Sequence, residues 1–269
     1  MTGGAPSPRG PLTAGERVLL VDPKQRRYLV TLRTGGSFHT HSGIVDHDDI
    51  IGDGEGRAVA GSTGRRFVVL RPTLADVVLK MPRGAQVIYP KDLGAILLAA
   101  DIGPDMRVLE AGVGSGALSM AMLRAGADVT GYELREDFAA HARSNVTDWT
   151  GAAARYRIEL RDVYEGIDEI ELDRIVLDLP EPSRVVPHAQ RALRPGGILL
   201  AYLPTINQTA ELRSTLARSA FGMAETSEVL RRTWHVEDRS VRPDHRMVAH
   251  TGFLTTARLL VPPGEGAVR

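Results

Sequence analysis

Short runs of aliphatic and β-branched residues dominate the first 80 positions of the chain. Three of them, residues 18–21, 27–32 and 66–70, are separated by turn-forming residues. Strand-like runs this close together, with no helical stretch of similar length between them, are typical of hairpins or a small barrel. The pattern therefore predicts a small β-domain over residues 1–80, and the Pro/Gly break at residues 81–84 marks its end.

From residue 91 the pattern changes, because stretches with helical spacing alternate with short apolar runs. Strands are expected at residues 107–110, 128–132, 155–160, 174–177 and 197–202, and helices at residues 93–100, 117–125, 137–149, 184–193 and 209–220. Repeated strand–helix units form a parallel sheet. Two later extended stretches, 225–234 and 247–261, are joined by a charged loop, and as an antiparallel pair they would close that sheet. The sequence thus predicts an α/β domain over residues 81–269.

Composition narrows the possible partners and chemistries. The 33 basic and 33 acidic side chains cancel, so no overall field attracts a polyanion, and local patches must bind one. Three short basic runs are candidates, although each is also typical of a solvated face: Lys24 to Arg27, Arg65 to Arg66 and Arg231 to Arg232. The absence of cysteine excludes disulfides, thiolate metal ligands and a cysteine nucleophile.

The amino-terminal residues and the apolar runs indicate where the protein resides. The first ten residues lack the apolar centre of a signal peptide, and no run reaches the roughly 18 apolar residues of a membrane span. We therefore expect a cytoplasmic protein with a loose amino-terminal tail and no membrane partner.

A glycine-rich turn, Gly112-Val113-Gly114-Ser115-Gly116, lies between a predicted strand and a predicted helix. Glycine permits positive φ and lets a ligand approach bare backbone, and the helix start supplies free N–H groups. With Ala117 the spacing also satisfies the dinucleotide fingerprint. From the spacing alone, NAD binding and a tight turn without a ligand remain open.

Four acidic residues end predicted strands: Glu110, Glu133, Asp162 and Asp178. The carboxyl ends of parallel strands face one crevice, so these groups should crowd a single site. Such crowding is unfavourable unless a cation or several donors are bound there. Taken singly, each residue is as typical of a helix cap or a turn, and Glu110 is also suited to bonding the loop amides.

These segments together resemble the class I methyltransferases, and within them the TrmI family of tRNA adenine-58 N1-methyltransferases. The resemblance is carried by the glycine turn with the preceding Val108-Leu109-Glu110, by Tyr132-Glu133, and by further segments. These are Gln86-Val87-Ile88-Tyr89-Pro90-Lys91-Asp92, Arg161-Asp162-Val163, Asp178-Leu179-Pro180-Glu181-Pro182 and Ala201-Tyr202-Leu203-Pro204. It covers nearly the whole chain, including the small β-domain and the closing hairpin.

The resemblance implies a Rossmann-like class I methyltransferase domain, with a parallel sheet closed by an antiparallel hairpin, behind a small β-domain. It implies methyl transfer from S-adenosylmethionine to N1 of an adenine in the T-loop of tRNA, by a homotetramer. Asp178 would be catalytic, and Tyr89 and Tyr202 would border the adenine. The implied cofactor-binding residues are Leu93, Glu110, Gly112, Gly114, Ser115, Gly116, Ala117, Leu118, Glu133, Leu134, Asp162, Val163 and Asp178.

The chemistry of adenine is consistent with these roles. N1 carries an in-plane lone pair and no proton, so the reaction needs position and charge complementarity rather than a general base. Asp178 can accept from the adenine amino group as the base becomes cationic. Tyr89 and Tyr202 can stack on a base swung out of the T-loop, although half-buried core tyrosines fit their pattern as well.

Three rival functions remain open at this stage. The first is a methyltransferase acting on another RNA adenine, a protein carboxylate or a small molecule. The second is a nicotinamide oxidoreductase, which is disfavoured because no second α/β domain with a proton-relay histidine follows. The third is a tRNA-binding subunit without catalysis. A metal site formed by His39, His41 and His47 with nearby aspartates is disfavoured too, because the stretch is a polar loop, so no metal is expected.

Overall fold

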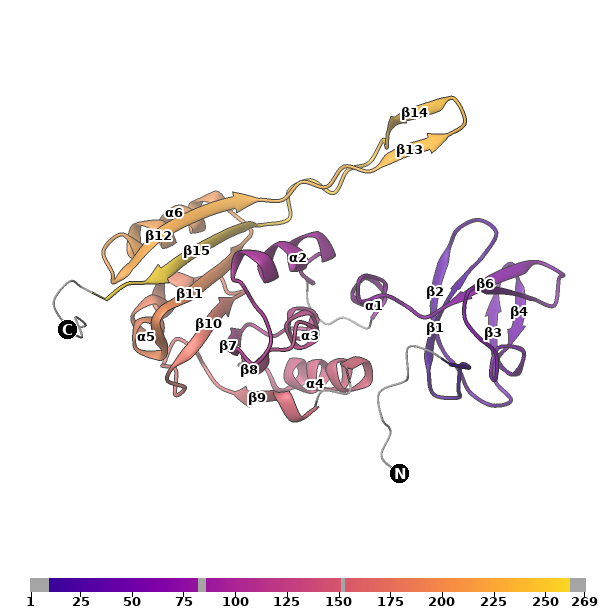
Figure 1. Ribbon diagram of the computed structural model, residues 1–269, viewed down its shortest axis with the longest axis horizontal. Helices are drawn as coiled ribbons and strands as arrows, with labels where there is room; N and C mark the ends of the chain where they lie inside the picture. Colours follow the sequence, from indigo (N-terminus) through magenta and orange to yellow (C-terminus); the bar gives the residue numbers. More distant parts are fainter. Residues whose placement is uncertain (1–9, 82–85, 151–152, 262–269) are drawn as a thin grey trace. The chain divides into compact units, whose positions relative to one another are not determined.

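The computed structural model describes residues 10–81, 86–150 and 153–261, which form two compact units (Figure 1). Unit 1 spans Met1–Pro82 and unit 2 spans Arg83–Arg269. The expected tail at residues 1–9 and most of the expected Pro/Gly break lie outside the described residues. No helix in the described ranges is long and apolar enough to cross a bilayer.

Unit 1 is built on a four-stranded antiparallel sheet with the order β2-β1-β6-β5. Val18, Leu20, Phe67 and Val69 point into its core, as the alternation along β1 and β6 requires. A separate two-stranded hairpin packs beside this sheet through Val45. The strands are β1 (Arg17–Val21), β2 (Arg27–Thr31), β3 (Ser37–Thr40), β4 (Gly43–Asp46), β5 (Arg57–Ala60) and β6 (Arg66–Leu70).

A helix ends this unit, where the sequence pattern is β-like up to residue 79. Helix α1 (Leu74–Lys80) begins at a capping box. The Thr73 hydroxyl accepts from the Asp76 amide at 3.2 Å, and the Asp76 carboxylate accepts from the Thr73 amide at 3.1 Å. Reciprocal bonds of this kind stabilise a first helical turn even when the following residues are β-branched, as Val77 and Val78 are. The apolar run alone did not reveal this start signal.

Unit 2 confirms the expected fold class. Its seven-stranded sheet has the order β12-β15-β11-β10-β7-β8-β9, with β7 to β11 parallel and β15 antiparallel to both of its neighbours. The strands are β7 (Arg107–Ala111), β8 (Asp128–Glu133), β9 (Tyr156–Leu160), β10 (Leu172–Leu177), β11 (Leu193–Leu203), β12 (Phe221–Glu228) and β15 (Phe253–Leu259).

Two groups of helices pack against this sheet on separate apolar clusters. Side chains of α5 and α6 join Leu109, Ile175 and Leu177 in the larger cluster. Ala139 and Ala142 of α4 pack with Val113 and Ile158 in another. The helices are α2 (Pro90–Ala99), α3 (Ala117–Arg124), α4 (Glu136–Thr150), α5 (Val186–Ala192) and α6 (Ile206–Leu216).

The closing pair differs in detail from the expected one. Strand β12 begins and ends earlier than residues 225–234, and β15 occupies only part of residues 247–261. The expected charged loop contains its own hairpin, β13 (Trp234–Glu237) and β14 (Ser240–Pro243), which extends beyond the sheet (Figure 1). The pattern was wrong here because the hairpin has its own backbone bonds and buries little, so its charged residues resemble a loop. We call residues 229–249 the arm.

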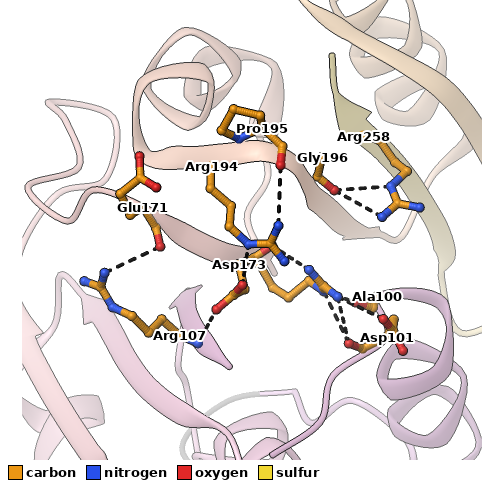
Figure 2. Close-up of polar contacts among 10 residues, drawn as sticks. Ala100, Asp101, Arg107, Glu171, Asp173, Arg194, Pro195, Gly196 and Arg258 are labelled. Atoms are coloured by element: carbon orange, nitrogen blue, oxygen red, sulfur yellow. Dashed lines mark hydrogen bonds and ion pairs between the residues drawn. The ribbon is translucent and has the colours of Figure 1, made fainter. Parts of the chain in front are cut away.

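Contacts of three arginine residues fasten the amino ends of β7, β10 and β11. Figure 2 shows Asp173 between Arg107 and Arg194: the Asp173 carboxylate accepts from the backbone amide of Arg107 at 2.9 Å and from the side-chain Nε of Arg194 at 2.5 Å. Arg174 is 2% exposed and donates to the backbone carbonyls of Ala100, Asp101 and Asp173. The amino ends of these three strands are therefore held by internal bonds, and the loops described next lie at the carboxyl ends.

Candidate active site

The glycine turn lies directly against the end of a neighbouring strand. Gly112 has φ +85°, and a Cβ there would lie 2.2 Å from the Asp178 carbonyl oxygen. The Asp178 amide in turn donates to the Ala111 carbonyl at 2.9 Å. Gly114 and Gly116 also have positive φ, at +55° and +80°. Only a residue without Cβ permits this approach, so the turn and Asp178 are held together by backbone.

Two cavities of unit 2 meet beside Asp178. The smaller lies against the glycine turn, and the larger has a volume of about 450 Å³. Both are lined by Gln86, Val87, Ile88 and Asp178. The smaller adds Glu110, Gly112, Val113, Gly114, Ser115, Ala117 and Leu118, and the larger adds Tyr89, Tyr202, Pro204, His250 and Thr251. Asp178 therefore faces both spaces.

The Asp178 carboxylate is enclosed but has no protein donor. No hydrogen bond to its side chain occurs in the part of the chain that the structure describes. Burial raises the pKa of Asp178 to about 7. An enclosed carboxylate without a partner is costly and is uncommon outside functional sites.

Glu110 is the most deeply buried of the four strand-end acids, at 1% exposed. It accepts a hydrogen bond from the Ser119 hydroxyl of α3, rather than bonding the loop amides. Burial raises the pKa of Glu110 to about 8, and the nearby Asp178 and Glu133 carboxylates add to the effect. At neutral pH Glu110 therefore holds its proton and acts as a polar wall of the smaller cavity.

The carboxylates of Glu133 and Asp162 accept hydrogen bonds from nearby backbone amides and can accept further ones from a ligand. Glu133 accepts from the Gly114 amide at 3.1 Å and from the Arg135 amide at 3.0 Å, which ties the glycine turn to the end of β8. Asp162 accepts from the Tyr164 amide at 2.8 Å. A carboxylate offers about four acceptor positions, so both retain free ones. Neither residue lines the two cavities.

The structure places the remaining expected cofactor residues in different surroundings. Ser115, Ala117 and Leu118 line the smaller cavity. Gly116 packs against α4, where a Cβ would lie 3.1 Å from a Val146 methyl group. Leu93 and Val163 are buried, each 4% exposed, whereas Leu134 is 70% exposed. None of these three residues lines either cavity.

Both expected substrate tyrosines line the larger cavity with Asp178. Tyr89 immediately precedes α2, and Tyr202 lies near the end of β11. Burial raises the pKa of Tyr202 to about 12. The chain passes directly against its ring at Gly252, where a Cβ would lie 2.5 Å from the ring carbon Cζ. The backbone at Gly252 thus leaves no room for a side chain between itself and the Tyr202 ring.

The segment containing Tyr89 also carries a buried ion pair that the sequence did not assign. Lys91 Nζ donates to Asp92 at 2.7 Å, to the Val229 carbonyl at 2.6 Å and to the Thr251 hydroxyl at 2.6 Å. Thr251 donates to the second Asp92 oxygen at 2.6 Å. The side chains of Lys91 and Asp92 are 4% and 0% exposed. This network fastens the start of α2 to the first residue of the arm and to Thr251, which follows the arm and lines the larger cavity.

His250 lines the larger cavity, and the sequence did not indicate it. Its ring nitrogens contact Glu228 and the Pro204 carbonyl. A histidine within a charged stretch gives no sequence signal of such contacts, because both partners are distant along the chain.

The histidine-rich stretch forms the β3–β4 hairpin and the turn after it, rather than the expected polar loop. This stretch and one of the basic runs, Lys24 to Arg27, have partners within unit 1. His47 Nδ1 accepts from the Arg33 amide at 3.0 Å, and no group of metal-binding side chains occurs among the described residues. Arg26 pairs with Asp22 at 2.6 Å and Arg27 with Asp76 at 3.2 Å.

Comparison with known proteins adds independent evidence. A family model described as "tRNA methyltransferase complex GCD14 subunit" matches residues 66–244, and one described as "TrmI-like N-terminal" matches residues 10–59. The tRNA (adenine(58)-N(1))-methyltransferase TrmI of Thermus thermophilus is 38% identical over 90% of this chain and 96% of its own. The tRNA (adenine(57)-N(1)/adenine(58)-N(1))-methyltransferase TrmI of Methanocaldococcus jannaschii is 35% identical over 91% and 95%.

Solved structures agree with these relatives. A SAM-dependent O-methyltransferase from Thermotoga maritima superposes with a TM-score of 0.89 at 36% identity, covering 93% of this chain and 95% of that one. The tRNA (m1A58) methyltransferase TrmI from Aquifex aeolicus has a TM-score of 0.83 at 29% identity, covering 93% and 99%. The resemblance seen in the sequence motifs is confirmed: this chain belongs to the TrmI family of tRNA adenine-58 N1-methyltransferases.

Proposed function

We propose that this protein acts in the cytoplasm and transfers a methyl group from S-adenosylmethionine to N1 of adenine 58 in the T-loop of tRNA. One observation carries the proposal: the unpartnered Asp178 carboxylate lies where a glycine-lined cavity meets a tyrosine-lined one. A donor and an acceptor of a methyl group must approach each other at such a junction. The relatives named above for this reaction support the same assignment.

The residues around the smaller cavity fit S-adenosylmethionine. The glycine turn brings bare backbone to the ligand, and a Cβ at Gly112 would fill the approach to Asp178. Glu133 would accept from the ribose hydroxyls and Asp162 from the adenine amino group of the cofactor. The carboxylates at the carboxyl ends of the strands are only partly compensated by hydrogen-bond donors of the protein, and this favours a cationic ligand. When bound, the cofactor supplies a methyl group on an electrophilic sulfonium.

The larger cavity would hold the target adenine after it leaves the T-loop stack. Tyr89 and Tyr202 offer aromatic surface for the base, and Asp178 offers an acceptor for its amino group. That acceptor stabilises the base more strongly as N1 gains a methyl group and the ring becomes cationic, so Asp178 acts mainly in the transition state. The N1 lone pair needs no base to free it.

Binding of tRNA and self-association would both involve the arm. It carries five arginines, Arg231, Arg232, Arg239, Arg242 and Arg246, all exposed and suited to phosphates. It also exposes Trp234, Val236 and Val241, at 58%, 70% and 61%. Apolar side chains on a projecting hairpin favour burial against another copy. We therefore include a homotetramer in the proposal.

A direct assay tests the substrate. Unmodified tRNA transcript incubated with the enzyme and methyl-labelled S-adenosylmethionine should gain label, whereas a transcript with guanine at position 58 should gain none. Label in both transcripts would place the methyl group elsewhere, for example on position 57, for which the archaeal relative is also named. Label in protein or small molecules alone would support the O-methyltransferase alternative that one structural relative's name suggests.

Substitution of Gly112 tests the cofactor cradle. Gly112→Ala should weaken S-adenosylhomocysteine binding about 100-fold by calorimetry, because the new Cβ must displace the Asp178 carbonyl. Gly196→Ala is the matched control: Gly196 has φ +78°, but nothing lies within 4 Å of its Cβ position. Equal effects of the two substitutions would assign the loss to backbone strain and contradict the cradle.

Substitution of Asp178 tests catalysis. Asp178→Asn should lower kcat by about 100-fold to 1,000-fold while cofactor affinity stays nearly unchanged, because the lost charge acts on the developing cation. In the wild-type enzyme kcat should rise as the pH increases through about 7, where Asp178 ionises. Unchanged turnover in the variant would remove Asp178 from the reaction.

The same substitution should stabilise the fold. Because the folded-state pKa of Asp178 lies above the ordinary aspartate pKa of 3.8, the wild-type protein loses stability as the pH rises from 3.8 through about 7. Asparagine does not ionise, so the variant does not lose stability in this way as the pH rises. The Tm of Asp178→Asn should therefore exceed the wild-type Tm at pH 8, with a difference that shrinks towards pH 4 in thermal melts.

Substitution on the arm tests self-association. Replacing Trp234 and Val236 by serine should reduce the assembly measured by light scattering, since the apolar contact surface is lost. Ile170→Ser provides the control, because Ile170 is 66% exposed but lies outside the arm. An unchanged mass for the arm variant would exclude the arm from the interface.

A further inference from the structure

His250 joins three chain segments that form one wall of the larger cavity. Its Nδ1 lies 2.7 Å from a Glu228 carboxylate oxygen at the end of β12. Its Nε2 lies 2.8 Å from the carbonyl oxygen of Pro204, which directly follows β11. The ring also packs on Phe253 at the start of β15, with ring centroids 4.8 Å apart.

These two contacts determine the protonation of the ring. A backbone carbonyl can only accept a hydrogen bond, and an ionised carboxylate likewise. Each ring nitrogen must therefore donate, and a neutral imidazole has only one N–H. Satisfying both contacts requires the imidazolium form of His250. Rotating the ring by half a turn would place carbon atoms against both acceptors and lose both bonds.

The charges around the ring are consistent with this form. The Pro204 carbonyl raises the pKa of His250 most, the Glu228 carboxylate raises it further, and partial burial and the Lys91 ammonium oppose them. Lys91 is itself neutralised by Asp92 at 2.7 Å. The other titratable groups lining the cavity are Asp178, Tyr89 and Tyr202.

The wall held by His250 includes the Tyr202 ring. Pro204 lies two residues after Tyr202, and Gly252, two residues after His250, lies against the tyrosine ring. The hydrogen bond between His250 and Pro204 therefore joins the two chain segments, 202–204 and 250–252, that contain and contact the Tyr202 ring. Glu228 connects these segments to β12.

We propose that His250 is a positioning residue that holds the Tyr202 wall of the substrate cavity only while its imidazole carries both protons. The inference rests on the proposed function, because it assigns the cavity to the tRNA adenine. Above the pKa of His250 one of the two acceptors loses its donor, and the wall loosens. Ionisation of Asp178 should thus raise activity as the pH increases, whereas loss of the His250 proton should lower it.

A pair of variants separates charge from structure. In Glu228→Gln the amide N–H can donate to a neutral Nδ1 while Nε2–H still donates to Pro204, so both bonds persist without the extra proton. This variant should keep kcat/KM for tRNA at pH 7 and lose the fall at higher pH. His250→Ala loses both bonds and should lower kcat/KM for tRNA about fivefold across the pH range, with unchanged S-adenosylhomocysteine affinity.

His141→Ala is the control, since it removes another exposed histidine, from α4, outside the arm and both cavities. It should leave the pH profile unchanged. A high-pH fall that persists in Glu228→Gln, or a His250→Ala enzyme with wild-type kcat/KM for tRNA, would overturn the proposal.

Nuclear magnetic resonance of the histidine rings provides a readout that does not depend on methylation. In the wild-type protein at pH 6.5 both nitrogens of His250 should carry protons, and in Glu228→Gln the ring should titrate at lower pH. A neutral wild-type ring at that pH would overturn the inference even if the enzyme methylates tRNA. A wild-type protein that does not methylate tRNA would instead refute the proposed function, while the ring titration still tests the protonation.

Discussion

The close contact between Gly112 and the backbone of Asp178 is the constraint on which the rest of the site depends. It brings the carboxyl ends of β7 and β10 together closely enough that one turn and one carboxylate serve two cavities. Backbone atoms make this contact, so its geometry does not depend on side-chain rotamers. The arginine contacts at the amino ends of the same strands fix the opposite edge. Placement of Asp178 therefore follows from the sheet itself.

The site concentrates enclosed carboxyl groups that a core would not tolerate for stability alone. Burial raises the pKa of Glu110 to about 8 and that of Asp178 to about 7. Glu110 is compensated by Ser119, whereas Asp178 has no donor among the described residues. The two acids thus differ in role: Glu110 is a satisfied part of the wall, and Asp178 remains available to a ligand.

The sequence predicted the fold class and the glycine turn because both depend on local periodicity and on glycine spacing. It missed α1, whose start depends on a reciprocal bond between Thr73 and Asp76, and it missed the hairpin within the arm, which is rich in charge. Lys91 and His250 were missed for another reason. Their partners lie 138 and 160 residues away for Lys91, and 22 and 46 residues away for His250. Pairings over such separations leave no pattern in a single sequence.

The buried ion pair of Lys91 also determines how the protein can be attached to a surface. The chain has only three lysines, and Lys91 has a side chain that is 4% exposed. The other two, Lys24 and Lys80, are exposed and belong to unit 1. Amine-directed coupling at lysine would therefore immobilise the protein through unit 1 and leave the catalytic unit unmodified. On a sensor chip prepared in this way, no residue that lines the two cavities of unit 2 would be chemically changed.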